Sequence, residues 1–512
     1  MNIRPRRASG ILLHLTSLPS PTGIGGLGRC AVAFLDFLAE AGQSLWQVLP
    51  VGPVDRALGG SPYCGVSAFA GNELLVDLED LSRLRLLREG EETHGWTTED
   101  SPVDWDLVFK RKGAILDKAW ERFRELPPLG NLKQGFEDFR SRHARWLGDY
   151  SLFCALKASN GGKAWIDWPE ALRRRESLEI KEARHALEER IERIEFGQWL
   201  FFRQWEALKE EARARRITLF GDLPIYVGLD SADAWGWREG FDLEPDGHPR
   251  TVAGVPPDYY SRTGQRWGNP TYRWETHSRE GFSWWRARVG HSLSLFDCVR
   301  LDHFRGLSAF WSIPAGEETA VNGKWVKAPG EELLESLAED HPGLPIVAED
   351  LGIITPDVVN LKERFELPGM RVVQFGFSRP VGNNPHAPHN FPENTVAYTG
   401  THDNNTARGW YEEELSKEGR DLLSRYAGHA VNAETVARDL VHMVLSSGAG
   451  WAILPLQDIL GLGSIARMNQ PARLQGNWTW RTKLPSREVA LELAEEVDLF
   501  GRNPLLPDNM IN

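Results

Sequence analysis

The chain has few cysteines, no long apolar run and a deficit of positive charge. Its 512 residues include only Cys30, Cys64, Cys154 and Cys298, and no two of these form a C-x-x-C pair. This spacing argues against a disulfide framework and against a structural zinc site. No apolar run approaches the roughly 18 residues that a membrane-spanning helix needs. The sequence therefore predicts a protein without a disulfide framework, a structural zinc site or a membrane-spanning helix.

The excess of acidic residues excludes a further class of protein. Lys and Arg together number 59, and Asp and Glu number 72, which gives a formal net charge of −13. A nucleic-acid partner is therefore not expected, because binding phosphates calls for a basic surface. Arg4–Arg7 precede a short apolar stretch, as in a signal peptide, but His14 interrupts it and no small-residue cleavage site follows. We expect a cytoplasmic protein.

Aromatic residues are abundant, with 21 Trp, 22 Phe and 9 Tyr. A large core explains such a composition, since aromatic side chains bury much area. A carbohydrate-binding protein explains it as well, because sugar rings present flat C–H faces that stack on aromatic rings. Composition alone leaves both interpretations open.

Eight short β-type runs, with helical patterns between them, indicate the fold class. The runs are 11–15, 44–49, 217–225, 296–304, 345–349, 371–377, 395–399 and 451–456. Between them, the helical pattern 31–41 ends at Gly42, and Thr355 followed by Pro356 is typical of a helix start. This alternation predicts an α/β fold, namely a single (β/α)₈ TIM barrel within residues 1–512.

The spacing between the runs is uneven. The segment 51–216 after the second run is much longer than a plain βα connection and carries helical patterns, so we expect an inserted, largely helical subdomain. A second insertion, 228–295, lies between the third and fourth strands and is rich in Gly, Pro and Trp. Insertions that follow barrel strands lie on the catalytic face, where they can build a substrate groove.

Carboxylates stand at or after the ends of three runs. Arg300 and Asp302 share one face of the fourth run, because side chains alternate along a strand, and the guanidinium favours an ionised Asp302. Glu349 ends the fifth run, and Asp403 follows the seventh. Taken singly, each motif has a purely structural explanation. Asp302 would form an ion pair, an acid such as Asp350 would cap the next turn, and Asp403 would lie in an ordinary loop. The barrel would bring all three carboxylates to one face.

Such a set of carboxylates suits the cleavage of a glycosidic bond. One carboxylate attacks the sugar carbon, while the other must hold a proton near neutral pH. A third anion nearby can raise the pKa of the acid by like-charge repulsion. Other residues that fit a sugar groove, with simple packing as the alternative for the aromatic ones, are Tyr63, Asp222, Asp258, Gln265 and Trp267.

Two other kinds of site fit the sequence poorly. Residues 23–28 match the pattern G-x-G-x-x-G, but they do not directly follow a strand, and no suitable acid ends the next run. We therefore expect no dinucleotide cofactor. His303 and His402 lie near acidic residues but form neither an H-x-H nor an H-E-x-x-H pattern, so we expect no catalytic metal.

Taken in order, these motifs resemble the 4-α-glucanotransferases, also called amylomaltases or disproportionating enzymes, of glycoside hydrolase family 77. The resemblance runs from Gly10 to Arg481, nearly the whole chain. Besides the three carboxylate motifs, it rests on the segments 13–19, 46–50, 61–63, 222–226, 254–270, 457–463 and 467–469.

The resemblance implies a retaining double displacement, without cofactor or metal, that transfers α-1,4-glucan segments between maltooligosaccharides or starch- and glycogen-type glucans. Cyclic glucans are a further product that it allows. It implies that Asp302 is the nucleophile, Glu349 the general acid/base and Asp403 a third carboxylate that holds sugar hydroxyls. The substrate contacts that it implies are Tyr63, Asp222, Asp258, Gln265, Trp267, Arg300, His303 and His402.

Two alternative functions stay open at the level of sequence. A net hydrolase of the same α-glucans would use the same residues, because access of water depends on the geometry of the groove. A catalytically inactive glucan-binding protein is the other alternative, and the intact Asp302, Glu349 and Asp403 argue against it. Oligomeric state and preferred glucan length are not predicted.

Overall fold

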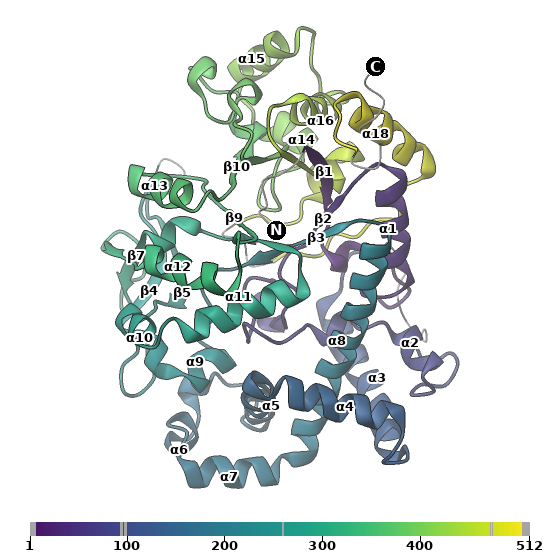
Figure 1. Ribbon diagram of the computed structural model, residues 1–512, viewed down its shortest axis with the longest axis vertical. Helices are drawn as coiled ribbons and strands as arrows, with labels where there is room; N and C mark the ends of the chain where they lie inside the picture. The colour runs from purple at the N-terminus through teal and green to yellow at the C-terminus, as the bar shows by residue number, and fades with distance from the viewer. Residues whose placement is uncertain are drawn as a thin grey trace.

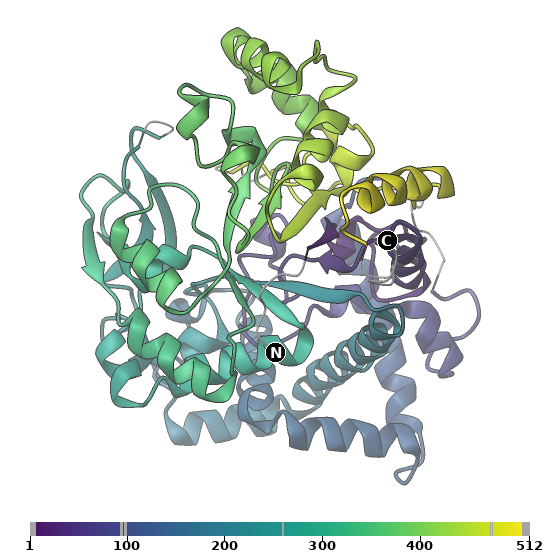
Figure 2. The ribbon, with the colours of Figure 1, turned by 45° about the horizontal axis from the view of Figure 1, so that its top comes forward.

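The computed structural model describes residues 7–92, 96, 100–258, 261–471, 473 and 475–503. Eight parallel strands form one sheet, in the order β10-β11-β12-β1-β2-β3-β6-β9. Their bounds are β1 Ala8–Leu12, β2 Leu45–Gln47, β3 Thr218–Leu223, β6 Cys298–Leu301, β9 Ile346–Ala348, β10 Gly369–Val372, β11 Thr395–Tyr398 and β12 Trp451–Pro455. Helices surround this sheet in both ribbon views (Figures 1 and 2).

The sheet closes into a barrel at a seam between β9 and β10, its first and last strands. No ladder joins these two strands within the part of the chain that the structure describes. Instead, the backbone N–H of Ala348 donates to the carbonyl of Pro368 over 2.8 Å. The all-parallel order and this closure confirm the predicted (β/α)₈ barrel.

The barrel strands are short apolar runs that are buried on both faces, as parallel strands covered by helices usually are. One core cluster contains Phe220, Cys298, Val347, Met370 and Val396, each from a different strand, and fills the barrel interior. Apolar residues that alternate with them, among them Leu219, Val299, Ile346 and Ala397, belong to a second cluster that also contains residues of the surrounding helices. This two-sided burial explains why the strands appear in the sequence as continuous apolar runs.

Each of the eight predicted runs overlaps one barrel strand. Two of the runs are displaced along the sequence from their strand, and the others contain their strand and extend beyond it by one to three residues at one or both ends. The first strand is Ala8–Leu12 rather than 11–15, and Leu15–Ser17 form a 3₁₀ turn. The sixth is Gly369–Val372 rather than 371–377, and Val373–Phe375 form another such turn. In both cases apolar residues continue from the strand into the turn, so periodicity alone could not place the strand end.

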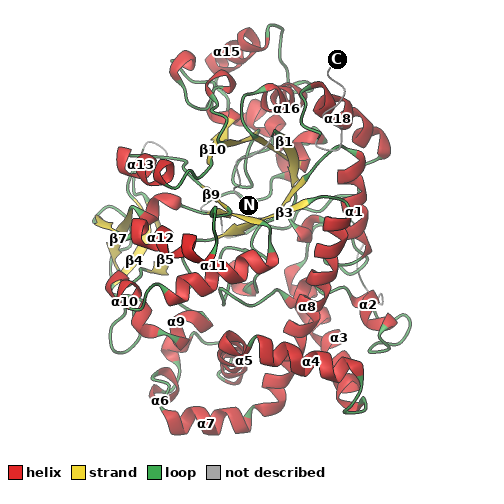
Figure 3. Ribbon diagram, viewed as in Figure 1, coloured by secondary structure: helices red, strands yellow, loops and turns green. Residues whose placement is uncertain are grey.

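Helices occupy the long connection between β2 and β3 (Figure 3). They are α2 Leu78–Arg83, α3 Trp105–Glu125, α4 Asn131–Arg142, α5 Ala144–Ser159, α6 Glu170–Arg173, α7 Ser177–Ala186 and α8 Glu188–Ala214. Aromatic rings pack between them; the ring centroids of Phe123 and Phe196 lie 4.8 Å apart. Much of the aromatic content therefore serves core packing.

The connection between β3 and β6 contains α9 Ala232–Gly236, β4 Thr251–Val255, β5 Gln265–Pro270, α10 Trp274–Arg279 and α11 Ser283–Leu295. Strands β4 and β5 join β7 Ala309–Pro314 and β8 Lys324–Lys327 in a second, antiparallel sheet of order β5-β4-β7-β8. The sequence did not indicate this sheet, because its strands are short and two of them flank a loop rich in Gly and Pro.

The remaining helices complete the shell around the barrel. They are α1 Arg29–Glu40, α12 Gly330–Asp340, α13 Pro356–Arg364, α14 Ala407–Gly409, α15 Lys417–Ala427, α16 Val436–Ser446, α17 Leu456–Ile459 and α18 Arg487–Leu499. Among the residues placed by the structure, no helix has the length and apolar character needed to span a bilayer.

Candidate active site

Four of the predicted carboxylates lie at the carboxyl ends of barrel strands, which open on one face of the barrel. Asp222 is the penultimate residue of β3, and Asp302 directly follows β6. Glu349 directly follows β9, and Asp403 lies in the loop 399–406 after β11. The closure of the barrel thus gathers residues that are far apart in the sequence.

A buried guanidinium links two of the carboxylates. Nη1 of Arg300 donates to both oxygens of Asp222, at 3.0 and 2.8 Å, and Nη2 donates to Oδ1 of Asp302 at 2.8 Å. The Tyr63 hydroxyl donates to Oδ2 of Asp222 at 2.7 Å. Burial raises the pKa of Asp222, while Arg300 opposes that rise. The side chain of Asp302 is 29% exposed, so Arg300 orients a carboxylate that a substrate can still reach.

Glu349 has a different environment. Its Oε2 accepts a hydrogen bond from the backbone N–H of His303 at 2.8 Å, and its Oε1 accepts one from the N–H of Leu351 at 3.0 Å. Burial raises the pKa of Glu349 to about 7; Asp302 adds to the rise and Arg300 opposes it. A carboxyl group that holds a proton near neutral pH suits general acid catalysis.

The third carboxylate is held by its own loop and by a segment near the end of the chain. The Asn469 amide donates to Oδ1 of Asp403 at 2.6 Å, and Arg467 donates to the Asp403 carbonyl at 2.8 Å. The adjacent His402 stacks on Tyr63, with ring centroids 5.0 Å apart and planes at 15°. Because Tyr63 also binds Asp222, it connects the Asp403 loop to the buried Arg300 network.

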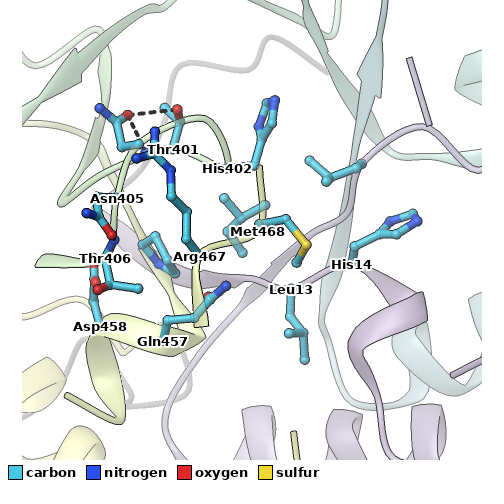
Figure 4. Close-up of a pocket in the computed structure, with 14 residues that line it drawn as sticks. Leu13, His14, Thr401, His402, Asn405, Thr406, Gln457, Asp458, Arg467 and Met468 are labelled. Atoms are coloured by element: carbon cyan, nitrogen blue, oxygen red, sulfur yellow. Dashed lines mark hydrogen bonds between the residues drawn. The ribbon is translucent and has the colours of Figure 1, made fainter. Parts of the chain in front are cut away.

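A pocket lies beneath the loop that carries Asp403 (Figure 4). It is lined by the ends of β1 and β12, by the loop itself and by Arg467 and Met468. At its wall, the buried Asp458 accepts hydrogen bonds from the Thr399 hydroxyl and from the N–H of Ala407. One side chain therefore ties together the two ends of the Asp403 loop.

The second sheet brings further predicted residues to the barrel mouth. Trp267 lies edge-on to His303, with ring centroids 4.9 Å apart, and its indole N–H donates to the Gln265 amide oxygen at 3.1 Å. The Asp258 side chain is exposed and accepts a hydrogen bond from the N–H of Ser261 at 2.7 Å, a bond local to its loop. Trp267 is thus placed beside the residue that follows Asp302, whereas Asp258 lies at the tip of the β4–β5 loop.

Sequence reasoning did not give a role to Asn469, Arg467 or Asp458. The segment 467–469 entered the family resemblance only as a motif, and Asp458 lies in another such motif. Asn469 and Asp403 are 66 residues apart, so no local pattern could show that they form a hydrogen bond. The parallel pairing of β11 with β12 brings the segments that follow these two strands together.

Comparison with known proteins identifies the family. A family model described as 4-alpha-glucanotransferase matches residues 13–486. The chain belongs to the 4-alpha-glucanotransferase family. It is 49% identical over 481 residues to the 4-alpha-glucanotransferase of Thermus thermophilus, covering 93% of this chain and 94% of that protein. It is 47% identical over 499 residues to the Aquifex aeolicus 4-alpha-glucanotransferase, covering 97% and 99%.

A solved relative supports the same assignment at the level of the fold. The amylomaltase from Streptococcus agalactiae, in complex with acarbose, superposes with a TM-score of 0.93 at 36% identity, covering 97% of this chain and 100% of that one. Membership of the family confirms the predicted enzyme class, a retaining glucanotransferase that acts on α-1,4-glucans. It favours transfer over the hydrolytic and binding-only alternatives that the sequence left open.

Proposed function

We propose that this chain moves α-1,4-glucan segments between donor and acceptor maltooligosaccharides, with Asp302 as the nucleophile and Glu349 as the general acid/base. One observation carries the assignment of roles. Glu349, with a pKa raised to about 7, accepts a hydrogen bond from the residue that follows Asp302, and Arg300 holds Asp302 by one oxygen. A retaining displacement uses a proton donor together with a nearby, oriented carboxylate, and the hydrogen bond from His303 places Glu349 and Asp302 in this relation.

In the first step, the Glu349 carboxyl transfers its proton to the glycosidic oxygen as the bond from this oxygen to the anomeric carbon breaks. Arg300 binds Oδ1 of Asp302, which leaves the other carboxylate oxygen to attack the anomeric carbon. The products are a glucosyl ester on Asp302, an ionised Glu349 and a shortened glucan that leaves with a new 4-hydroxyl.

In the second step, ionised Glu349 accepts the proton of the 4-hydroxyl of an acceptor glucan. The acceptor oxygen attacks the anomeric carbon, and the ester bond to Asp302 breaks. Two displacements on the same carbon restore the α configuration. Water in place of the acceptor would give hydrolysis, and the far end of the same donor would give a cyclic glucan.

The other site residues are assigned to substrate binding. Asp403, held by Asn469, is placed to accept hydrogen bonds from hydroxyls of the reacting sugar. The remaining contacts that we propose are Tyr63, Asp222, Asp258, Gln265, Trp267, Arg300, His303 and His402. The inserted segments 51–216 and 228–295 would form the walls of the glucan groove. The cytoplasmic location expected from the sequence stays a prediction.

Incubation with maltotriose, with product sizes and total reducing ends followed together, tests this function. Transfer would give longer and shorter glucans at a constant number of reducing ends. Asp302→Asn should abolish turnover, whereas Asp340→Asn, at an exposed ion pair with Arg286, should not alter it. Reducing ends that rise in step with product, or near-normal turnover by Asp302→Asn, would contradict the proposal.

A further inference from the structure

Asp350 lies beside Glu349 but takes no part in the steps above. Its side chain is only 4% exposed, and both of its oxygens are bound. Oδ1 accepts a hydrogen bond from the N–H of Met370 at 2.6 Å, and Oδ2 pairs with Nζ of Lys362 at 2.6 Å. Nη1 of Arg371 lies 3.3 Å from Oδ2. One buried carboxylate thus joins the end of β9 to helix α13 and strand β10.

These contacts cross the seam at which the barrel closes. Neighbouring barrel strands elsewhere in the sheet are joined by parallel ladders, but β9 and β10 share none in the described parts of the chain. One backbone hydrogen bond, from Ala348 to Pro368, crosses the seam. The N–H of Met370 donates instead to the Asp350 carboxylate, which takes the place of a backbone carbonyl in a ladder. The side chain therefore fixes the register of two strands that backbone pairing leaves loosely joined.

The backbone of β10 leaves room for this carboxylate. A Cβ atom at Gly369 would lie 2.5 Å from Oδ2 of Asp350 and 2.7 Å from Nζ of Lys362. Any larger residue at position 369 would thus displace the ion pair. The pair is built into the seam and differs from the exposed ion pairs on the helices.

The segment that carries Asp350 also contacts Glu349. The N–H of Leu351, one residue after Asp350, donates to Oε1 of Glu349 at 3.0 Å. Glu349 therefore depends on the backbone path of residues 349–351, and Asp350 is the side chain of this segment that is anchored to β10. The sequence alternative that Asp350 caps the following turn is wrong, because Glu349 itself accepts that N–H.

We propose that Asp350 is a positioning residue for Glu349: its bonds to Met370, Lys362 and Arg371 hold the Glu349 carboxyl where it can reach the glycosidic oxygen. The proposal rests on the role of Glu349 proposed above. A shift of about 1 Å in a reacting group can reduce the rate by about 10²-fold, so the seam contacts matter for the proton transfer.

A comparison of two donors tests the proposal. Maltotriose needs its leaving oxygen protonated, whereas α-maltosyl fluoride has a leaving group that departs with little help from an acid. The rate of maltotriose turnover and the rate of the initial fluoride burst are measured for the wild type and for Asp350→Ala, Asp350→Asn and Glu349→Gln. Melting curves establish that each variant is folded, and Asp350→Asn, which keeps the side-chain volume, decides the test if Asp350→Ala does not fold.

The expected pattern is a selective loss. Glu349→Gln should lose roughly 10²–10⁴-fold with maltotriose and far less in the fluoride burst. Asp350→Ala should show the same selectivity at about 10–10²-fold, and Asp350→Asn a smaller loss of the same kind. Asp458→Asn is the matched control, since this buried carboxylate also binds a backbone N–H but supports the Asp403 loop; it should lower both rates equally.

The two hypotheses fail in different ways. If Glu349→Gln shows the selective loss while both Asp350 variants lose the two activities equally, or lose neither, the positioning role is wrong. If Glu349→Gln itself loses both activities equally, the role of Glu349 is wrong, and the positioning role falls with it.

Discussion

The backbone N–H of His303 donates a hydrogen bond of 2.8 Å to the Glu349 carboxyl. His303 follows Asp302 directly and lies in the left-handed region at φ 50, which costs a non-glycine residue roughly 1–3 kcal/mol. His303 thus links the loop that carries Asp302 to the side chain of Glu349. A displacement of the Asp302 loop would consequently move a hydrogen-bond donor of Glu349.

The raised pKa of Glu349 predicts the pH dependence of the reaction. Because burial and Asp302 raise its pKa to about 7, the carboxyl is protonated below that pH and loses its proton above it. We expect kcat/KM for maltotriose to fall as the pH rises through about 7, since the first step needs the acid form. Initial rates across this range measure the effect. Glu349→Gln should lack the fall, and a wild-type fall centred well below pH 6 would contradict the assignment.

Tyr63→Phe tests the link between the Asp222 network and the Asp403 loop. The variant keeps the ring that stacks on His402 but loses the hydroxyl that donates to buried Asp222. A lost hydrogen bond to a charged group costs about 1.5–3 kcal/mol, so we expect kcat/KM to fall by roughly 10-fold or more. Steady-state kinetics and thermal melting measure the two effects.

Tyr411→Phe provides the control for this variant. Its hydroxyl donates to the carbonyl of Val431 at 2.8 Å, on the outer shell of the barrel. This variant should lose some stability and keep its activity. Equal activity of the two variants would show that the Tyr63 hydroxyl has no part in the site.

Trp267→Ala should change the balance between transfer and hydrolysis. The indole is 37% exposed and lies against His303, where it can cover the glucosyl ester on Asp302. Its removal should admit water, so we expect reducing ends to be released several-fold more often per transfer event. Trp325→Ala, at an indole that is 40% exposed on β8 of the same sheet, is the control. An unchanged ratio in Trp267→Ala would exclude the shielding role.

Arg502 should contribute to stability without affecting catalysis. Its guanidinium is fully buried and donates to the carbonyls of Leu445, Ala8, Gly450, Ser447 and Ala449, at the amino ends of β1 and β12. Arg502→Met removes these donors, although the carbonyls of Leu445, Ser447 and Gly450 each keep another donor, from Arg7 or from the N–H of Ala8. A buried carbonyl that loses its donor costs about 1–3 kcal/mol, so we expect the free energy of unfolding to fall by about 3 kcal/mol.

Denaturant unfolding measures this loss. Arg487→Met is the control, because its ion pair with Glu40 is exposed and should contribute at most about 1 kcal/mol. Turnover per folded molecule should be unchanged in both variants. A similar free energy of unfolding in the two variants would show that water or other donors bind the buried carbonyls in place of Arg502.

The sequence predicted those parts of the molecule that leave a local pattern. The barrel strands are short apolar runs because both of their faces are buried, and Asp302 and Glu349 are conspicuous because each interrupts or ends such a run. The second sheet left no such pattern. Its strands β7 and β8 follow β6 along the chain, whereas their partners β4 and β5 precede it.

The sequence by itself determined the fold class, the candidate carboxylates and the family, since these follow from periodicity, spacing and ordered motifs. Only the tertiary structure decided which groups surround each carboxylate. Asn469 reaches Asp403 because β12 pairs with β11, and Asp350 reaches Met370 because the barrel closes between β9 and β10. The pKa that makes Glu349 an acid near neutral pH likewise arises from burial and from the nearby charges, which are properties of packing in three dimensions.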